Sequence, residues 1–470
     1  MKILKKFLLV SILLLLTNSY CFSNEKLYYT APTLLPGTSR EMKTAGFWIS
    51  RHPCPDKIIM TPVEVAQFNS RIQNELKLTK DITQWPTEYP GQELKNFLEN
   101  KLNEFQAKGF YGPDGHKAAK LFFNLMKASM NLDAIPTTIK LQYGFVVHFA
   151  DQRHLPTEEA LYEKSNDIDF DELQNSDLDV GTPVAILHKS LDEDWFYVET
   201  DISSGWVKAE DVALGTLEDI KKFVNADFEQ TGKRVVVTND KGDIFLDETL
   251  TDYYDYVRMG NQFPYRNGYD NGALEVVIPM RMEDGKLIFR AGFMKGEDIH
   301  EGFLSYTSRN IIEQAFKLLN EPYGWGGMYG EQDCSRFLIE VFSTVGINLP
   351  RNSKDQARVG RELAQFKPDS SAATLSLLLK NAVGAVQGMI ILTLKGHIML
   401  YLGMVDDRHF AIHATWAYRE KGLWGDRTRV INRVAVTDLS LGKGTKKKSW
   451  LERLLTVNVI SNSQEEICGH

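Results

Sequence analysis

The hydrophobic pattern changes its period along this chain of 470 residues, and that change limits the folds it can adopt. From about Leu27 to Lys140 the apolar residues recur with a helical period. From Tyr143 to about residue 300 they alternate, as in short strands, and after residue 301 both periods occur. Because the chain is too long for one hydrophobic core, we predict a multidomain α+β protein.

The boundaries of these patterns predict four domains. They are a mostly helical N-terminal domain over 27–140, two small β-barrels over 141–213 and 214–300, and a C-terminal α+β domain over 301–470. Both β segments consist of short alternating runs between turns, as small barrels do. The sequence shows no repeat that links them.

Capping signals predict three of the helices. A first helix over 61–78 has Thr61 as its cap and Glu64 three residues later. An Asn310–Glu313 capping box precedes a second helix, and a third runs from about Cys334 to Val345. A further amphipathic helix over 115–132 is expected to bury one apolar face, which comprises Leu121, Phe122, Leu125 and Met126.

The first residues have the layout of a secretory signal peptide, 1–23. Three lysines precede an apolar run from Phe7 to Leu16, which is too short to span a bilayer. A fixed apolar anchor and a lipid anchor on Cys21 are the alternatives. No other stretch is apolar enough for a membrane span, so we expect an exported protein, periplasmic or secreted into the cell envelope.

Net charge argues against nucleic acid as a partner. The full chain has a formal charge of −8, with 54 Lys and Arg against 62 Asp and Glu. Removal of 1–23 takes away three lysines and leaves 51 against 62, or −11. Such a chain would be repelled by phosphate backbones. The lysine cluster at 442–450 is expected to be a solvated loop.

The four cysteines differ in their surroundings. Cys54 and Cys468 could pair or remain inert, but Cys334 follows the glycine-rich stretch EPYGWGGMYGEQD and starts a helix. A helix N-terminus favours a thiolate over a thiol, and glycines let a backbone approach a substrate closely. Cys334 is therefore either a nucleophile or a buried, inert cysteine.

Two histidines could serve such a nucleophile. His397 and His413 lie on consecutive predicted strands, 16 residues apart. A hairpin centred on Val405 would place them on one face, whereas a two-residue turn at Asp406–Asp407 would place them on opposite faces. The catalytic interpretation thus predicts an odd-length loop. A zinc site is the alternative, but it lacks a closely spaced ligand pair and a fourth ligand.

At these residues the sequence resembles the NlpC/p60 family of papain-like cysteine peptidases. The resemblance rests on PYGWGGMYGEQDCSRFLIEVFSTVGINLPRNS, GHIMLYLG and AIHA. Weaker resemblance upstream implies an N-terminal domain and two bacterial SH3 domains, as in a multidomain branch of the family. That branch cuts the γ-D-glutamyl-diamino acid bond of wall peptides with a free N-terminal L-alanine.

The resemblance also implies roles for individual residues. Cys334 would be the nucleophile, His397 the base and His413 the orienting residue. Substrate binding would fall to Asp333, Ser335, Ser353 and Trp325, with Asp333 and Ser335 holding the free amine. Asp333 could also cap the helix. Tyr162 and Tyr197 are candidates for closing the pocket, and Arg336 replaces the glycine usual after DCS.

We therefore expect an exported cysteine endopeptidase that cleaves the γ-D-glutamyl bond to meso-diaminopimelate or L-lysine in peptidoglycan stem peptides. No cofactor or metal is expected. Peptidoglycan stem peptides or murein fragments are the expected partners, without nucleic acid. The alternatives are a non-catalytic wall-peptide binding protein and an N-acetylmuramoyl-L-alanine amidase that uses the same thiol.

Overall fold

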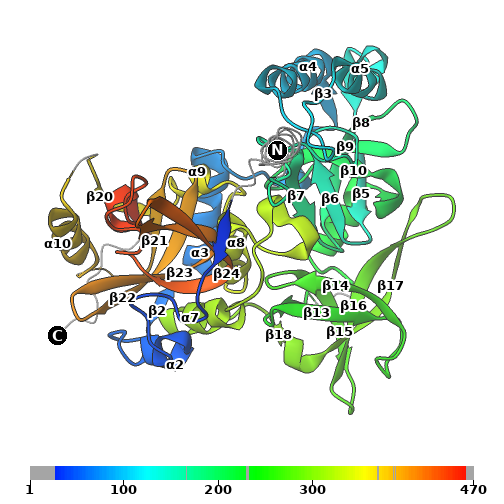
Figure 1. Cartoon of the computed structure of the whole chain (residues 1–470). Helices are drawn as coiled ribbons and strands as arrows, with labels where there is room; N and C mark the ends of the chain where they lie inside the picture. The colour runs from blue at the N-terminus through cyan, green and yellow to red at the C-terminus, as the bar shows by residue number, and fades with distance from the viewer. Residues whose placement is uncertain are drawn as a thin grey trace, which may run out of the picture.

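Three seven-stranded sheets form the framework of the molecule. The computed structural model describes residues 27–461 except 166, 229–231, 368–369, 385 and 387. Figure 1 shows a C-terminal α/β unit on one side and two β units stacked on the other. The predicted signal peptide and Cys468 lie outside the described residues. Cys54 is disulfide-bonded.

The C-terminal unit is built on one sheet in the order β1-β24-β23-β22-β21-β25-β20. All neighbours are antiparallel except β1 and β24. The strands are β1 (Tyr28–Thr30), β20 (Arg361–Gln365), β21 (Met389–Leu394), β22 (His397–Val405), β23 (Arg408–Gly422), β24 (Gly425–Asp438) and β25 (Leu454–Ile460). The long β23–β24 hairpin extends beyond its neighbours, and β22 and β23 form the centre.

Helices cover both faces of this sheet. On one face lie α7 (Ser308–Lys317) and α8 (Cys334–Ser343), and on the other lies α10 (Ala372–Val383). The predicted apolar face of α8 is confirmed, since Phe337, Leu338, Val341, Phe342 and Val345 are all buried. The predicted cap at Asn310 is wrong. The cap is Thr307, whose hydroxyl accepts from the backbone N–H of Asn310.

The first β unit has the sheet order β11-β5-β8-β9-β10-β6-β7. Its strands are β5 (Gln142–Val146), β6 (Ala150–Arg153), β7 (Gln174–Leu178), β8 (Pro183–Lys189), β9 (Trp195–Glu199), β10 (Ser204–Lys208) and β11 (Val212–Gly215). The alternating pattern predicts most of them. It does not predict β7, whose sequence QNSDL is polar yet mostly buried.

The second β unit has the order β14-β13-β17-β16-β15-β12-β18. Its strands are β12 (Arg234–Val237), β13 (Lys241–Phe245), β14 (Tyr253–Arg258), β15 (Gln262–Gly268), β16 (Ala273–Arg281), β17 (Leu287–Lys295) and β18 (Ile299–Glu301). Helix α6 (Leu217–Val224) links the two β units. Its Phe223 lies 5.0 Å from the ring of Phe145 and 5.8 Å from that of Phe289. One apolar cluster therefore runs through both units.

The segment predicted as one N-terminal domain, 27–140, is divided between two cores. Helices α2 (Ala45–Ile49) and α3 (Pro62–Ser70) pack into the core of the C-terminal unit, and β2 (Ile58–Met60) pairs with β19 (Tyr306–Thr307). The later elements pack on the first β unit. These are β3 (Glu88–Pro90), α4 (Gly91–Lys108), α5 (Lys120–Ser129) and β4 (Thr138–Lys140).

Local predictions in this segment have mixed outcomes. The capping box of Thr61 and Glu64 is confirmed. The predicted buried face of the later helix is confirmed only in part. Phe122 and Met126 are partly buried against the apolar cluster of the β units, whereas Leu121 and Leu125 are exposed and Phe123 is buried in their place. That helix is short and lies at the periphery, so it buries a narrower face than its composition indicates. No helix among the described residues is long and apolar enough to cross a membrane.

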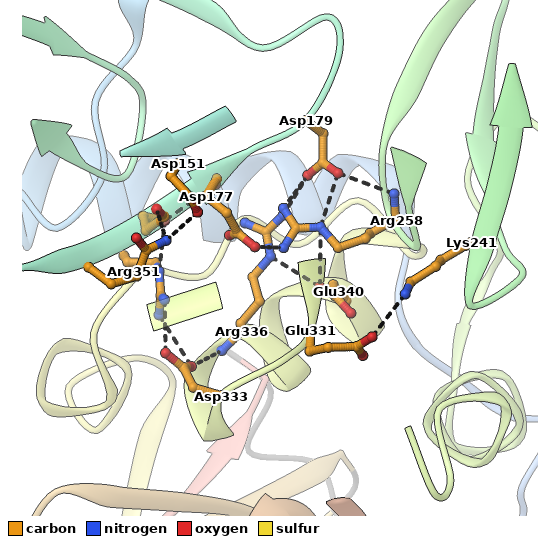
Figure 2. A network of polar contacts seen from close by, with 12 residues as sticks. Asp151, Asp177, Asp179, Lys241, Arg258, Glu331, Asp333, Arg336, Glu340 and Arg351 are labelled. Carbon is orange, nitrogen blue, oxygen red and sulfur yellow. Dashed lines mark hydrogen bonds and ion pairs between the residues drawn. The ribbon is translucent and has the colours of Figure 1, made fainter. Parts of the chain in front are cut away.

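Buried charges join the three units where they meet (Figure 2). Arg258 of β14 donates to Asp177 and Asp179 in the first β unit, with its Nε 3.0 Å from Asp179 Oδ1. Asp179 also accepts from Arg336 of α8 at 2.7 Å, and Arg336 donates to Glu340 at 3.1 Å. All five side chains are buried. Ion pairs between units thus join the first β unit to each of the other two units.

This network predicts a large cost for removing its central cation. Arg258→Met leaves Asp177 and Asp179 buried without the cation that they share, so we expect a loss of about 3–5 kcal/mol in the free energy of unfolding. Urea denaturation measures it. Lys286→Met, which removes an exposed pair with Asp284, is the matched control and should leave the transition unchanged. Equal transitions for both variants would contradict a structural role for the network.

Candidate active site

Cys334 occupies the first turn of α8. Asp333 is the N-cap, and its Oδ1 accepts from the backbone N–H groups of Ser335 at 3.0 Å and Arg336 at 2.8 Å. The capping role predicted for Asp333 is therefore confirmed. Cys334 is 7% exposed and is the free cysteine of the described residues. Its thiol lies within reach of the backbone at Ile398, the residue after His397.

The hairpin that carries the two histidines differs from the predicted one. Val405 pairs with Arg408, so the loop is the two-residue turn Asp406–Asp407 and not an odd-length loop. Both aspartates have positive φ, 48° and 56°, as a type I′ turn requires. With this turn alone, His397 and His413 would lie on opposite faces of the sheet.

A β-bulge restores the shared face. The register shifts between Tyr401 and Gly403, so that Leu400 pairs with Ile412. One extra residue in β22 changes the parity of every pair beyond it. His397 and His413 consequently lie diagonally on one face, with ring centroids 4.8 Å apart. The shared face was predicted for the wrong reason, since a bulge and not the loop produces it.

A hydrogen-bonded chain fixes the imidazoles. His397 Nε2 lies 2.6 Å from His413 Nδ1, and His413 Nε2 lies 2.8 Å from Thr437 Oγ1 on β24. When His397 Nε2 donates to His413, His413 Nε2 donates in turn to the Thr437 hydroxyl. This arrangement leaves Nδ1 of His397 as the nitrogen able to accept a proton.

Burial sets the resting protonation of the site. Burial raises the pKa of the Cys334 thiol to about 12, and the Asp333 carboxylate adds to the effect. Burial lowers the pKa of His397 to about 3, and the charges of Arg453 and Lys447 lower it further. The predicted lowering of the thiol pKa is not observed, because burial outweighs the backbone hydrogen bonds from Ile398 and Ser335, which lower it. The resting pair is a neutral thiol and a neutral imidazole.

Trp450 covers both histidines. Its ring centroid lies 5.0 Å from that of His397 and 5.3 Å from that of His413. Trp450 itself is 5% exposed. An apolar ring in this position keeps water from the imidazole pair and contributes to the low pKa of both.

Asp333, which the resemblance implies as a ligand of the substrate amine, is bonded to neighbouring side chains through both oxygens. Its Oδ2 accepts from Arg351 Nη2 at 2.8 Å, while its Oδ1 takes the cap bonds and the Ser335 hydroxyl at 2.8 Å. Ser335 Oγ accepts from Arg351 Nη1 at 3.0 Å. Arg351 also donates to Ser176 of the first β unit at 3.0 Å. Asp333 and Ser335 thus both accept buried hydrogen bonds from Arg351.

The remaining predicted substrate residues lie at the edge of the site. Trp325 is half-buried and contacts Phe170 of the first β unit, with centroids 5.2 Å apart. Ser353 begins the short helix α9 (Ser353–Gln356) and is half-buried. Of the two tyrosine candidates, Tyr197 is enclosed in the first β unit and bonds Ser204. Tyr162 is also buried. Phe170 is the residue of the first β unit whose ring contacts Trp325.

The glycine-rich loop before Cys334 packs closely against the two β units. Gly327 and Gly330 have φ of 91° and 70°. A side chain at Gly327 would collide with the Asp177 carboxylate, and one at Gly330 with the Tyr256 hydroxyl. Glycine is required here because the neighbouring units approach the backbone so closely.

Arg336 points into the buried network of Figure 2. Its guanidinium bonds Asp179 and Glu340. The residue that departs from the family pattern therefore ties the catalytic helix to the first β unit, and it adds no cation to the substrate site.

Comparisons with known proteins agree with this geometry. Residues 320–420 match the model of the NlpC/P60 family, and residues 160–208 match an SH3 domain of the SH3b1 type. The chain carries an NlpC/P60 domain. That domain contains Cys334, His397 and His413, and the first β unit contains the SH3b domain.

Two relatives extend the comparison. The gamma-D-glutamyl-L-lysine dipeptidyl-peptidase of Bacillus subtilis (strain 168) is 39% identical over 56 residues, which are 12% of this chain and 19% of that protein. The matched region thus spans about a fifth of the relative. An NlpC/P60 endopeptidase from Photobacterium damselae subsp. piscicida has a TM-score of 0.72 at 20% identity, over 94% of this chain and 100% of the other. That likeness shows the fold across nearly the whole chain.

Three residues around the NlpC/P60 site were not found from the sequence. Thr437, Trp450 and Arg351 reach the histidines or Asp333 from separate segments. Thr437 lies on β24, beside the strand that carries His413, and on the same face of the sheet as the two histidines. Its place near them could be predicted only if the register of these strands were known. Trp450 and Arg351 lie in loops, where periodicity gives no signal.

The neutral resting pair predicts how the thiol ionises. The ultraviolet absorbance of thiolate, taken as wild type minus Cys334→Ser, should be absent at neutral pH and appear only as pH approaches the pKa of about 12. Above the ordinary thiol pKa of about 8.5 the unfolded chain binds fewer protons than the folded one, so stability falls as pH rises. Thiolate at neutral pH that disappears in His397→Ala would instead indicate a resting ion pair.

Proposed function

We propose that this protein is a cysteine peptidase that hydrolyses the γ-D-glutamyl-diamino acid bond of peptidoglycan stem peptides. The observation that carries the proposal is the free Cys334 at the start of α8, close to the first residues of β22. That strand begins with His397, which is hydrogen-bonded to His413 on β23. A nucleophile, a base and an oriented second group are what thiol acyl transfer needs.

In the proposed reaction His397 takes the Cys334 proton as the thiol attacks the γ-D-glutamyl carbonyl. The resulting imidazolium and oxyanion attract each other in a dry site, which offsets the cost of creating two charges. The N–H groups of Ser335 and Arg336 are bound to Asp333, so the Cys334 N–H is the first-turn donor left for the oxyanion. His397 then protonates the leaving amine, and water activated by His397 releases the acyl group.

The support for this bond comes from two sources. The relative from Bacillus subtilis carries γ-D-glutamyl-L-lysine in its name, and its match covers 12% of this chain. The SH3b domain beside the site agrees with a substrate from the cell wall. A cell-envelope location is part of the proposal, supported by the lysines and apolar run of the first 16 residues.

A preference for a free N-terminal L-alanine, with the amine held by Asp333, is a further part of the proposal. Both oxygens of that carboxylate are bound to Arg351 and to the helix cap. A substrate amine would have to displace the guanidinium. An N-acetylated copy of the stem peptide measures whether the preference exists.

Mass spectrometry of a defined peptide tests the bond. Incubation of the protein with L-Ala-γ-D-Glu-meso-diaminopimelate should release L-Ala-D-Glu. Cys334→Ala should abolish release, and His397→Ala should lower it by about 10²–10⁴-fold. EDTA should leave the rate unchanged, as a thiol mechanism uses no metal. Binding of the peptide without cleavage would favour a wall-peptide binding protein, and release of an intact stem from muramic acid would favour an amidase.

Thr437 offers a separate test of the imidazole chain. Thr437→Val keeps the shape but removes the hydroxyl that bonds His413, so we expect kcat to fall by about tenfold with KM unchanged. Thr437→Ser should restore kcat because it restores the hydroxyl. A Val variant with full kcat would show that the chain from His397 to Thr437 does not position the base.

A further inference from the structure

The turn of the β23–β24 hairpin is apolar and almost fully exposed. Gly422 pairs with Gly425, so Leu423 and Trp424 form a two-residue turn. Their side chains are 91% and 97% exposed, the highest values among the large apolar side chains of the described residues. Hairpin turns in water are usually made of Gly, Asn or Asp. A leucine next to a tryptophan in this position therefore indicates a role other than folding.

The hairpin carries this turn beyond the centre of the sheet. β23 pairs with β24 from Phe410 to Gly422, whereas β22 pairs with β23 from Arg408 to Ile412. The outer half of the hairpin thus extends past the central strand β22, with β1 beside β24 at residues 428–430. A two-stranded extension of this kind presents its turn to whatever lies beyond the domain.

Lysines lie beside this turn on two segments. Lys421, on β23, is exposed, and so are Lys443 and Lys446 of the loop 442–450. The lysine side of the loop is therefore solvated, as the sequence predicts, while its Trp450 is buried. Positive charge thus borders the apolar turn on the exposed side of both segments.

Two contacts place the loop 442–450 against the end of the hairpin. The Lys446 backbone N–H donates to the Asp426 carboxylate at 2.7 Å, two residues after the turn. A side chain at Gly444 would lie 3.8 Å from Cδ of Lys421. The exposed lysines of the loop therefore lie at the same end of the hairpin as the apolar turn.

This end of the molecule is basic although the chain is acidic. Segments 419–429 and 443–453 together contain nine Lys and Arg and three Asp and Glu, whereas the whole chain has a formal charge of −8. Acidic groups here are engaged within the surface, since Glu420 pairs with Arg429 at 2.7 Å. The formal excess of six positive charges favours an anionic partner.

We propose that this tip surface, which comprises Leu423 and Trp424 with Lys421, Lys443 and Lys446, docks on an anionic phospholipid membrane. Tryptophan is favoured at the level of the lipid headgroups because its ring is apolar and its N–H is polar. Lysines beside it reach the anionic headgroups while their stems stay on the apolar side.

The size of the tip surface favours a membrane over a protein partner. Its two apolar side chains are too few for a stable protein interface, which buries roughly 800 Å² per partner. They suffice for reversible contact with a bilayer when cations add to it. The contact is peripheral, since no helix in the described part of the chain could cross a membrane.

Docking would hold the NlpC/P60 domain at the membrane surface. The loop that carries Lys446 also carries Trp450, whose ring lies 5.0 Å from that of His397. The tip surface itself contains none of the residues of the proposed reaction, so docking is independent of which bond is cleaved.

Vesicle sedimentation tests the docking. The chain from residue 24 onwards contains every described residue and removes the apolar run 7–16 as a source of lipid binding. It should bind vesicles that contain phosphatidylglycerol more tightly than vesicles of phosphatidylcholine alone, and less tightly as salt rises. Leu423→Ser with Trp424→Ser should lower the partition coefficient by about 10- to 100-fold. Lys421→Gln and Lys446→Gln should each lower it by about fivefold on the anionic vesicles.

A matched control and separate readouts distinguish the outcomes. Lys286→Gln, at an exposed pair with Asp284 in the second β unit, should bind as the wild type does. All variants should keep the wild-type melting temperature, because the changed side chains are exposed. Wild-type protein that does not bind anionic vesicles, or that binds no better than the variant with both serines, would overturn the proposal. A wild-type dimer that this variant converts to a monomer would assign the tip surface to a second copy of the chain and overturn it too. Cleavage of the soluble stem peptide is measured separately, and its absence would overturn the proposed function alone.

Discussion

The arrangement of the whole molecule depends on one buried carboxylate, Asp179. It accepts hydrogen bonds from Arg258 of the second β unit and from Arg336 of the catalytic helix. A buried carboxylate without partners costs several kcal/mol of folding free energy. Docking of the three units provides Asp179 with the two arginines that offset this cost. Burial raises the pKa of Glu340 to about 7. Burial also raises the pKa of Asp177, whereas Arg258 and Arg336 hold the pKa of Asp179 below its ordinary value.

This docking fixes the start of the catalytic helix. Arg336 lies two residues after Cys334, and Arg351 holds the N-cap carboxylate Asp333 while it donates to Ser176 of the SH3b domain. The first turn of α8 is thus tied to the SH3b domain at two points. The same packing removes water from the thiol and explains why it is neutral at rest. In this account the SH3b domain is part of the site as well as a neighbour of it.

The features that the sequence predicts best are those that depend on residue spacing within one helix. The capping box of Thr61, the cap at Asp333 and the buried face of α8 follow from spacing within one helix. The family motifs located Cys334 and both histidines, which the structure brings to one place. These signals are short in sequence and do not depend on the rest of the fold.

Other features depend on distant partners and leave no local pattern. Strand β7 reads as a polar loop, because Ser176 and Asp177 are buried only where Arg351 and Arg258 meet them. The close packing of Gly327 and Gly330 against Asp177 and Tyr256 depends on the two β units, which the pattern of the loop does not place. The bulge that brings the histidines together is a matter of register, which pattern alone does not fix.

Hydrogen–deuterium exchange of the Asp179→Asn variant tests the central claim most directly. If docking of the SH3b domain holds the catalytic helix, amides in the first turn of α8 should exchange faster in the variant, together with those of β7 and β14. Faster exchange confined to β7, with α8 protected as in the wild type, would contradict this account.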